Sequence, residues 1–486
     1  MIDFLTSFRS KNPFLFDFFI ATAPIFGCAF VLILSSIILG NPICQSVTDT
    51  YVRDARGNLQ VPPISNISLQ DWAGWLLMLF SFSIVLMWKR VRSDTKLVYA
   101  IWLCIVLHHA VAFLNTYVVT VAGASMDARG FHEIGVNLSV LPEPVWAFSI
   151  INGLVTYTHS LGLIYRACGV SLFLGEELSV LAFTLSCVVL VKLVDLLDLR
   201  RFRVVIILLF GLLPSAVIFR SVTLRESWQA LFFLLSVYWA LRLQKRLGIL
   251  RVLFLLISVY CLSLMHASLS KYAICLILTS FCWMIFGRKK DVRRKWHVSF
   301  LFDGLLIACA IVLAQKMGWF VTVGEILEEA KNFRNDAVTI YGRTTYAFVS
   351  LDTSSVLGLV TTIPMIFVQY MFTPFPWQVE SVKDIYALLE SMLRFLLLFF
   401  AVYSWRRSSG EARSYYGFLL IIFLGMELMW ALGTINWGTA IRHHVVGYSV
   451  IVLLGAPGLI LFIRRLHFEM FGCRKVSRFQ DREQIY

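Results

Sequence analysis

Long apolar segments alternate with short polar ones along most of the chain. Many of the apolar segments approach the roughly 20 residues that a helix needs to cross the hydrocarbon core of a bilayer. Twelve spanning helices are predicted, at residues 18–40, 72–88, 97–119, 177–196, 204–219, 226–241, 252–266, 271–287, 299–316, 385–404, 415–434 and 446–463. The pattern therefore predicts an all-α, polytopic integral membrane protein with one transmembrane domain over residues 1–486.

Short basic runs between the apolar segments set the orientation, because Lys and Arg are enriched in cytoplasmic loops. The densest run covers residues 288–295. With all such runs inside, both termini are cytoplasmic. Two further apolar stretches, 146–167 and 355–373, cannot span without placing a basic run outside, so they are predicted to be re-entrant or interfacial helices of the outer face. Outer loops 120–176 and 317–384 would then roof a cavity.

Composition removes several classes of protein. The chain is 59% hydrophobic and 15% charged, with a mean hydropathy of +0.77, which excludes a soluble globular protein. The net charge of +14 comes mostly from the short inner runs, so binding to nucleic acid is not expected. None of the ten cysteines forms a CxxC pattern, and no metal site or disulfide framework is predicted.

Arginines in the predicted outer segments need an explanation, since the positive-inside bias does not account for them. A guanidinium group offers a planar fork of donors that matches phosphate, and it stays charged. Alternatively, each arginine pairs with a nearby carboxylate or reaches toward lipid headgroups. The predicted phosphate ligands are Arg220, Arg225, Arg343 and Arg442, with Arg334 as a secondary candidate.

The segment SMDARGFHEIG offers acid–base chemistry in the outer loop after the helix predicted at 97–119. Asp127 is the leading candidate for a general base on a hydroxyl group, with His132 next and Glu133 as a secondary candidate. If the segment is helical, Arg129 lies on the same face as His132 and Glu133 and helps keep Asp127 ionised. The alternative for Asp127 is a purely structural helix N-cap.

Other ionisable residues lie within or beside predicted spans. His108 and His109 are adjacent, so they point to different faces and are expected to be packed in the bundle. Arg394 is expected to form a buried ion pair with Glu390 or Glu427, because charges within the membrane are usually paired. The last predicted outer segment contains His443 and His444. Each of them either acts as a base or phosphate contact or simply lies at the membrane interface.

Five short motifs together resemble a known group of proteins. They are DAxxFH (127–132), LPSAVIFRSVTLRES (213–227), RTTY (343–346), FTPFPW (372–377) and GTINWGTAIRHH (433–444). Residues 120–450 resemble the O-antigen polymerases (Wzy-like) and the wider GT-C superfamily of polytopic membrane glycosyltransferases. Some GT-C members carry an acidic pair soon after the first helix, and this chain has in that region only a polar cap with Asp49, Asp54 and Asp71, so the subgroup stays open.

The resemblance implies a transferase or polymerase of surface polysaccharide assembly in the bacterial cytoplasmic (inner) membrane. Its donor would be a saccharide on undecaprenyl phosphate or pyrophosphate, with no nucleotide sugar and no cofactor. Asp127 would face the acceptor hydroxyl, and the outer arginines would hold the donor phosphates. Membrane lipids and other polysaccharide-assembly proteins would be further partners. Two alternatives remain: a flippase or transporter of the same lipid-linked saccharides, and a non-catalytic membrane scaffold.

Overall fold

A computed structural model describes residues 52–53, 59–60, 71–121, 127–141, 147–151, 153–286, 327–332, 334 and 349–471. The predicted spans 18–40 and 299–316, and the candidate phosphate ligand Arg343, lie outside these residues. Among these residues the regular structure is helical apart from two short antiparallel strands, β1 (Val52–Arg53) and β2 (Leu59–Gln60). The predicted all-α class is confirmed for the described part of the chain.

Six of the described helices are long and apolar enough to cross a membrane. They are α5 (Thr95–Tyr117), α8 (Leu172–Leu196), α13 (Ala267–Phe286), α17 (Val382–Arg407), α18 (Gly410–Gly433) and α19 (Trp437–Phe471). Three shorter apolar helices are α3 (Trp72–Leu86), α12 (Ile249–Ser263) and α16 (Val356–Phe372). Helix length and hydropathy thus indicate a multi-pass membrane protein. The full set of twelve spans stays a prediction.

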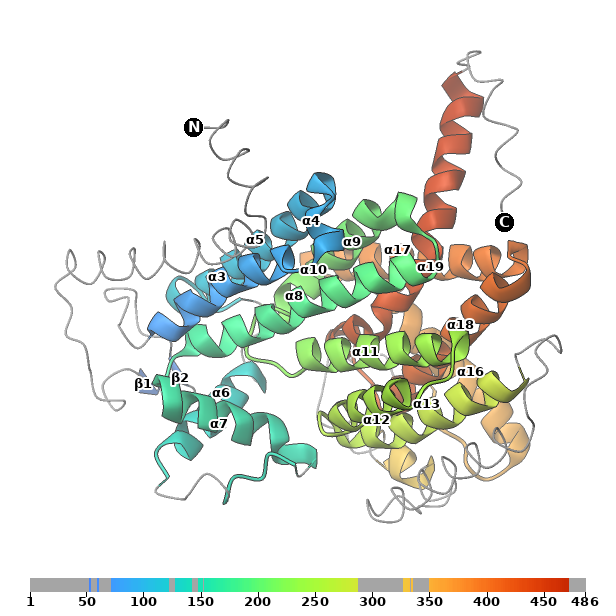
Figure 1. The fold of residues 1–486 in the computed structure, drawn as a ribbon. Coiled ribbons are helices and arrows are strands. Elements are labelled where there is room, and N and C mark those ends of the chain that lie inside the picture. Colours follow the sequence, from blue (N-terminus) through green and yellow to red (C-terminus); the bar gives the residue numbers. More distant parts are fainter. Residues whose placement is uncertain are drawn as a thin grey trace, which may run out of the picture. The chain divides into compact units, whose positions relative to one another are not determined.

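Contacts divide the chain into two compact units. Unit 1 comprises Met1–Lys192 and Arg203–Leu231, and unit 2 comprises Leu193–Phe202 and Phe232–Tyr486. Figure 1 labels the helices of both units. The single transmembrane domain over residues 1–486 stays a prediction.

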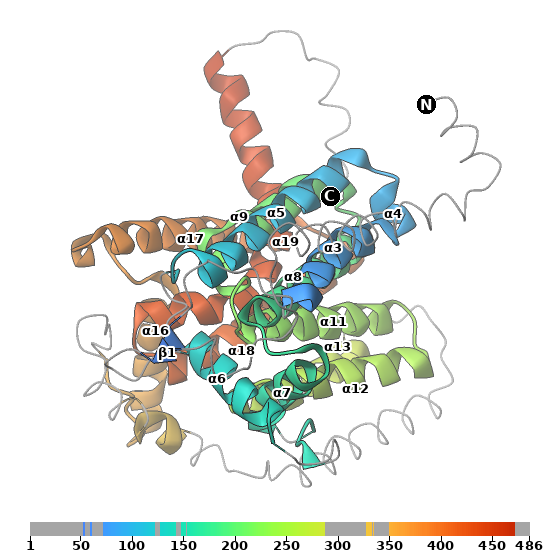
Figure 2. The ribbon, with the colours of Figure 1, turned by 90° about the vertical axis from the view of Figure 1, so that its left-hand side faces the viewer.

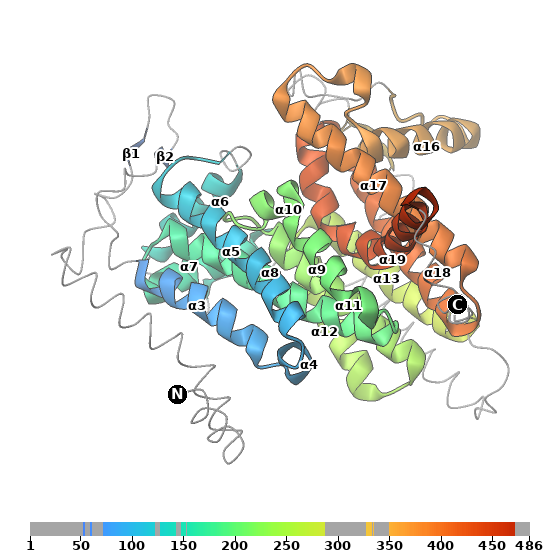
Figure 3. The same ribbon diagram turned by 90° about the horizontal axis from the view of Figure 1, so that it is seen from above.

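Unit 1 is built around α5 and α8. The remaining elements that belong to it wholly or in part are α4 (Lys89–Arg92), α6 (Asp127–Ser139), η4 (Gly153–Val155), α7 (Thr156–Cys168), α9 (Arg203–Leu212), α10 (Pro214–Phe219) and the start of α11 (Glu226–Lys245). Helix α5 packs against α3 and α9, and α6 packs against α7 (Figure 3). Asp94 caps α5 by accepting hydrogen bonds from the backbone N–H groups of Lys96 and Leu97, and it also pairs with Arg203.

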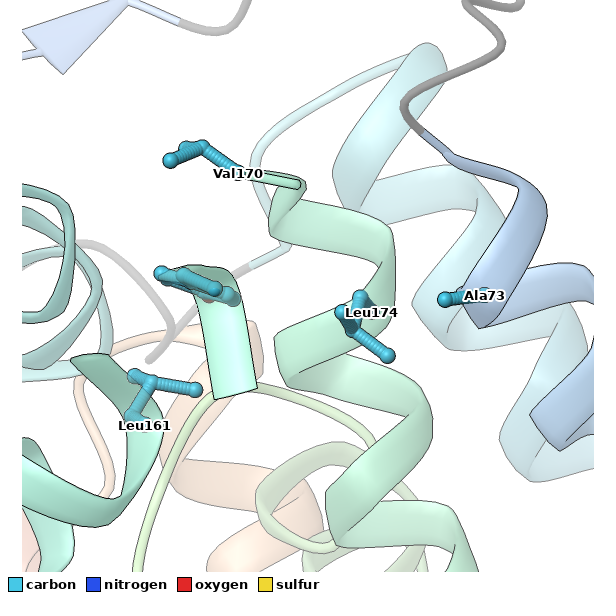
Figure 4. Packing of buried hydrophobic residues seen from close by; sticks show 5 residues of the cluster. Ala73, Leu161, Val170 and Leu174 are labelled. Carbon is cyan, nitrogen blue, oxygen red and sulfur yellow. The ribbon is translucent and has the colours of Figure 1, made fainter. Parts of the chain in front are cut away.

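A small apolar cluster joins α3, α7 and α8 in unit 1. Figure 4 shows Leu174 of α8 between Ala73 of α3 and Leu161 of α7, with Val170 just before α8. Tyr165 of α7 completes the cluster. This packing matters for the candidate site because it fixes α7, and with it α6, against the first turns of α8.

The span predicted at 204–219 is not one helix. Instead, α9 ends at Leu212 and α10 begins at Pro214, with Leu213 extended between them. Proline has no N–H to donate and its ring clashes with the preceding turn, so it is tolerated at the first position of a helix but not in its interior. The prediction of a continuous helix here was wrong.

Unit 2 contains the remaining helices. Its α12 and α13 run side by side (Figure 2), α13 and α16 both pack on α18, and α17 packs along α19 (Figure 3). Two short 3-10 helices are η5 (Arg200–Phe202) and η7 (Pro376–Gln378). The stretch 355–373 forms α16, and in unit 1 the stretch 146–167 forms η4 and most of α7; their depth in the membrane stays a prediction.

The last helix is longer than the sequence pattern indicates. Helix α19 begins at Trp437, whereas the span was predicted over 446–463. Residues 437–445, expected in an outer loop, therefore occupy the first turns of α19. As a result, Arg442, His443 and His444 are held on a rigid helix rather than on a loop.

Candidate functional site

Helix α6 carries the predicted acid–base residues of unit 1. It is regular through Gly130, so Arg129 does lie one turn from His132 and Glu133. Asp127 is in the first turn, where a carboxylate is favoured by the helix dipole, and its side chain is exposed. Arg129 donates a hydrogen bond to the hydroxyl of Thr120. The helix thus presents a carboxylate at its exposed end.

His132 lies on the opposite, buried face of α6. Its Nδ1 is 2.7 Å from the hydroxyl oxygen of Tyr165 on α7, and only 2% of the residue is exposed. Burial, together with the nearby charge of Arg129, lowers the pKa of His132 to about 3. The imidazole is therefore neutral near pH 7 but enclosed between two helices, which leaves Asp127 as the more accessible of the two candidate bases.

The turn that carries Arg225 comes close to α6. The guanidinium group of Arg225 lies over the ring of Phe131 at 5.2 Å, a cation–π contact. Phe131 in turn meets Tyr157 of α7 edge to face at 5.3 Å. Since Phe131 is one helical turn from Asp127, the structure brings one predicted phosphate ligand to the helix of the predicted base. Burial raises the pKa of Tyr157, so this phenol stays protonated.

Arg220, at the other end of the same turn, is enclosed in the interior of unit 1. Its guanidinium lies over the ring of Phe210 at 4.0 Å and within 5.7 Å of Phe183, and Nη1 donates to the backbone oxygen of Phe210 at 3.4 Å. The residue is 0% exposed. Arg220 and Arg225 therefore have different surroundings although they were predicted to act alike.

In unit 2, Arg334 is engaged with backbone carbonyl groups. Nη1 donates to the oxygens of Ala431 and Thr434 at 3.0 and 3.1 Å, and Nη2 donates to that of Val349 at 3.3 Å. Ala431 and Thr434 are at the C-terminal end of α18, where carbonyl groups lack partners within the helix and a cation is favoured. This geometry gives Arg334 a capping role.

The RHH triplet stands in the first turns of α19. His443 places Nδ1 3.0 Å from the hydroxyl of Thr434 and stacks on Trp430 at 3.9 Å. Convergence of Arg220, Arg225, Arg343 and Arg442 stays a prediction. Two of these arginines belong to unit 1, Arg442 belongs to unit 2, and Arg343 lies outside the described residues.

A polar cluster within the membrane-length helices of unit 1 was missed by the sequence analysis. The carboxylate of Glu177 on α8 contacts Nδ1 of His109 on α5, with Oε1 at 2.9 Å and Oε2 at 2.7 Å. The adjacent Glu176 accepts hydrogen bonds from Asn115 at 2.5 Å and Thr116 at 2.7 Å. The available signal was a pair of carboxylates close to the predicted start of an apolar run, since acidic residues within a span are functional candidates by default.

Unit 2 buries a second carboxylate–imidazole pair. Oε2 of Glu427 on α18 lies 2.6 Å from Nδ1 of His444 on α19, and Nε2 of the same ring lies 3.1 Å from the backbone oxygen of Tyr370 on α16. Buried Arg394 of α17 donates from Nη1 to the backbone oxygen of Met371 and interacts electrostatically with Glu390 and Glu427. The residue is buried as predicted, and its ion pair with Glu390 or Glu427 stays a prediction.

His108, the neighbour of His109 in sequence, is packed inside unit 1, as predicted. His108 stacks on Phe183 at 3.7 Å, and its Nδ1 is 2.7 Å from the backbone oxygen of Cys104. In the part of the chain that the structure describes, no group of three or more His, Cys, Asp or Glu side chains is arranged to hold a metal ion.

Fold and site together define a polytopic α-helical membrane protein with buried carboxylate–imidazole pairs. Comparison with protein-family models, with curated proteins and with solved structures finds no match for this chain. The family resemblance of the motifs therefore stays a prediction.

Proposed function

We propose that the protein is a membrane glycosyltransferase or polymerase of surface polysaccharide assembly. It takes sugar units from an undecaprenyl-phosphate- or pyrophosphate-linked donor at the outer face of the cytoplasmic membrane. The observation that supports this most is the arrangement of α6, where an exposed carboxylate, Asp127, lies one turn from Phe131, the ring under the Arg225 guanidinium. A base and a phosphate-binding cation are the two groups that the reaction needs.

The chemistry assigns one task to each group. Asp127 accepts the proton of the acceptor hydroxyl as its oxygen forms the new bond to the anomeric carbon of the donor sugar. The bond between that carbon and the phosphate oxygen breaks, and its electron pair stays on the phosphate. Arg225 stabilises this developing negative charge. Arg343 and Arg442 are proposed as further phosphate ligands, and buried Arg220 would hold the turn that carries Arg225.

A second candidate function has its own support. Unit 1 contains a glutamate–histidine pair within membrane-length helices, and such groups occur in the proton relays of pumps and transporters. This observation favours a flippase or transporter of the same lipid-linked saccharides. The two candidates share the donor but differ in whether a glycosidic bond is made.

The variant Asp127→Asn tests the proposed base. Asparagine keeps the volume of the side chain and its ability to accept hydrogen bonds, but it removes the basicity. We expect normal expression and a fall in product formation of roughly 100-fold or more. Glu411→Gln is the matched control, because Glu411 is also an exposed acid in the first turn of a helix, α18, at its predicted cytoplasmic end. Full product formation by Asp127→Asn would remove Asp127 from the mechanism.

A further inference from the structure

The Glu177–His109 pair of unit 1 has an unusual hydrogen-bond arrangement for a buried pair. Both residues lie in membrane-length helices, with Glu177 0% and His109 5% exposed. Nδ1 of the imidazole is hydrogen-bonded to Oε1 of the carboxylate at 2.9 Å, and Oε2 lies 2.7 Å from the same nitrogen. Nε2 of the same ring is buried and has no hydrogen-bond partner among the described residues. The ring therefore has one nitrogen engaged and one that can still accept a proton.

The number of protons on the Glu177–His109 pair determines its charge. A neutral imidazole carries one N–H, and a carboxylate can only accept, so the contact between them needs one proton on Nδ1 or on the carboxyl group. With the proton on Nδ1, Nε2 has a lone pair. Uptake of one proton there converts the imidazole to imidazolium and takes the pair from a net charge of −1 to zero. A neutral pair is the less costly state inside a membrane.

We propose that His109 and Glu177 form a proton-binding site within the membrane span of unit 1, with Nε2 of His109 accepting the exchangeable proton. The step transfers one proton from hydronium to imidazole and needs no other reactant. The site is separate from the proposed transferase chemistry, which does not use either residue. It would stand whether the chain transfers sugars or moves lipid-linked saccharides.

The charged and titratable groups around the pair are consistent with this role. On α8 the neighbour is Glu176, whose carboxylate is held by Asn115 and Thr116 and interacts with Arg129 of α6. On α5 the neighbours are His108 and Tyr117. Asp71 at the start of α3 acts on Tyr117, and Arg220 acts on His108. Phe82 of α3 covers the imidazole at 5.3 Å and contributes no charge.

The Glu427–His444 pair of unit 2 provides a control within the same molecule. There Nε2 faces the backbone oxygen of Tyr370, which can only accept a hydrogen bond, so Nε2 must already carry a hydrogen. Nδ1 shares a second proton with Glu427 across 2.6 Å. Both nitrogens of His444 are therefore committed, and this pair has no position for an additional proton.

The test is nitrogen NMR of the full-length protein in lipid nanodiscs, with ¹⁵N-labelled histidine rings assigned through their backbone resonances. Between about pH 5 and pH 8, where the charge of an imidazole ordinarily changes, we expect the ring signals of His109 to move and those of His444 to stay constant. In Glu177→Gln the movement of the His109 signals should be lost, whereas Glu427→Gln should leave it in place.

Constant His109 signals over this range overturn the proposal, as does an equal movement of the His444 signals. If Glu177→Gln fails to fold, the comparison of the two histidines in the unaltered chain still decides. Loss of sugar transfer in Asp127→Asn has no bearing on this result, so the two proposals fail independently.

Discussion

Unit 1 and unit 2 each bury a glutamate against a histidine inside membrane-length helices, but the two imidazoles have different surroundings. His444 of unit 2 lies between Glu427 and the backbone oxygen of Tyr370, so three helices are joined through one ring. His109 of unit 1 has a hydrogen-bond partner on one nitrogen only among the described residues. The same two residue types thus make a fixed crosslink in one unit and a proton-accepting pair in the other.

Residue identity alone therefore does not decide the role of a buried ion pair. What decides it is whether the surrounding backbone satisfies the remaining hydrogen-bonding groups. Unit 2 adds Arg394 and Glu390 to its pair, which balances the charges of the cluster. Single substitutions in each unit test this difference between the two pairs.

Gly447→Ala should have the largest effect on stability. A Cβ atom at this position of α19 would overlap Oε1 of Glu427, so the carboxylate has to shift, which weakens its contact with His444. Complete separation of a buried pair costs roughly 3–5 kcal/mol, and the loss should be at most of this size. Thermal unfolding in detergent measures the loss. The control is Gly425→Ala in α18, where the nearest atom, on Tyr272, is 3.7 Å from the added carbon. Equal unfolding temperatures for Gly447→Ala and the unaltered chain would contradict the assignment of a fixed crosslink.

His444→Gln and His109→Gln compare the two pairs directly. The first variant disturbs two hydrogen bonds of a buried, charge-assisted cluster, and the second disturbs one. We expect losses of roughly 3 kcal/mol and about half that, respectively. Denaturation of the purified variants under identical conditions gives both values. A loss at His109 as large as the loss at His444 would mean that both pairs are structural.

Arg334→Lys and Arg225→Lys compare two arginines that the sequence analysis treated as candidates for the same task. A single ammonium group cannot reach the three backbone oxygens that Arg334 contacts, so this variant should lose about 1–2 kcal/mol of stability. Arg225→Lys keeps the charge over Phe131 and should change stability by less than about 1 kcal/mol. It should nevertheless reduce sugar transfer, because the fork that binds phosphate is lost. A stability loss in Arg225→Lys together with reduced sugar transfer in Arg334→Lys would contradict both assignments.

His132 should give unit 1 a pH dependence of stability. Its pKa is about 3 in the folded protein against an ordinary value of 6.5, because it is buried. Between these values the unfolded chain binds more protons, so this contribution is fully present above pH 6.5 and is lost as the pH falls. The slope is at most about 1.4 kcal/mol per pH unit. His132→Gln keeps an acceptor for Tyr165 and should flatten the unfolding-temperature profile below pH 6.5; an unchanged profile would contradict the role of burial.

Much of the helical framework could be predicted from the apolar pattern, because spanning helices have a length that the bilayer sets. The helices α3, α5, α11, α12, α13, α17 and α18 each lie where a span was predicted, with ends shifted by a few residues. Hydropathy alone could not show the break between α9 and α10, because the apolar run continues through it. The proline at position 214 was the signal that could have predicted it.

Less of the candidate site could be predicted from the sequence. His109 and Glu177 are 68 residues apart, and nothing local indicates that they meet. The capping role of Arg334 depends on backbone oxygens almost 100 residues further along the chain. The α6 segment was easier, because helical spacing correctly placed Arg129 beside His132 and Glu133. Tertiary packing, rather than any motif, distinguishes the arginines from one another.

The most direct measurement of the proposed function uses the purified full-length protein in liposomes with an undecaprenyl-pyrophosphate-linked saccharide as donor. The products are separated by chromatography, and their masses are determined by mass spectrometry. A transferase yields a longer saccharide with a new glycosidic bond, together with free undecaprenyl pyrophosphate, and Asp127→Asn should yield roughly 100-fold less of both. Recovery of the donor with its saccharide intact, but redistributed between the leaflets, would contradict the transferase and establish the transporter.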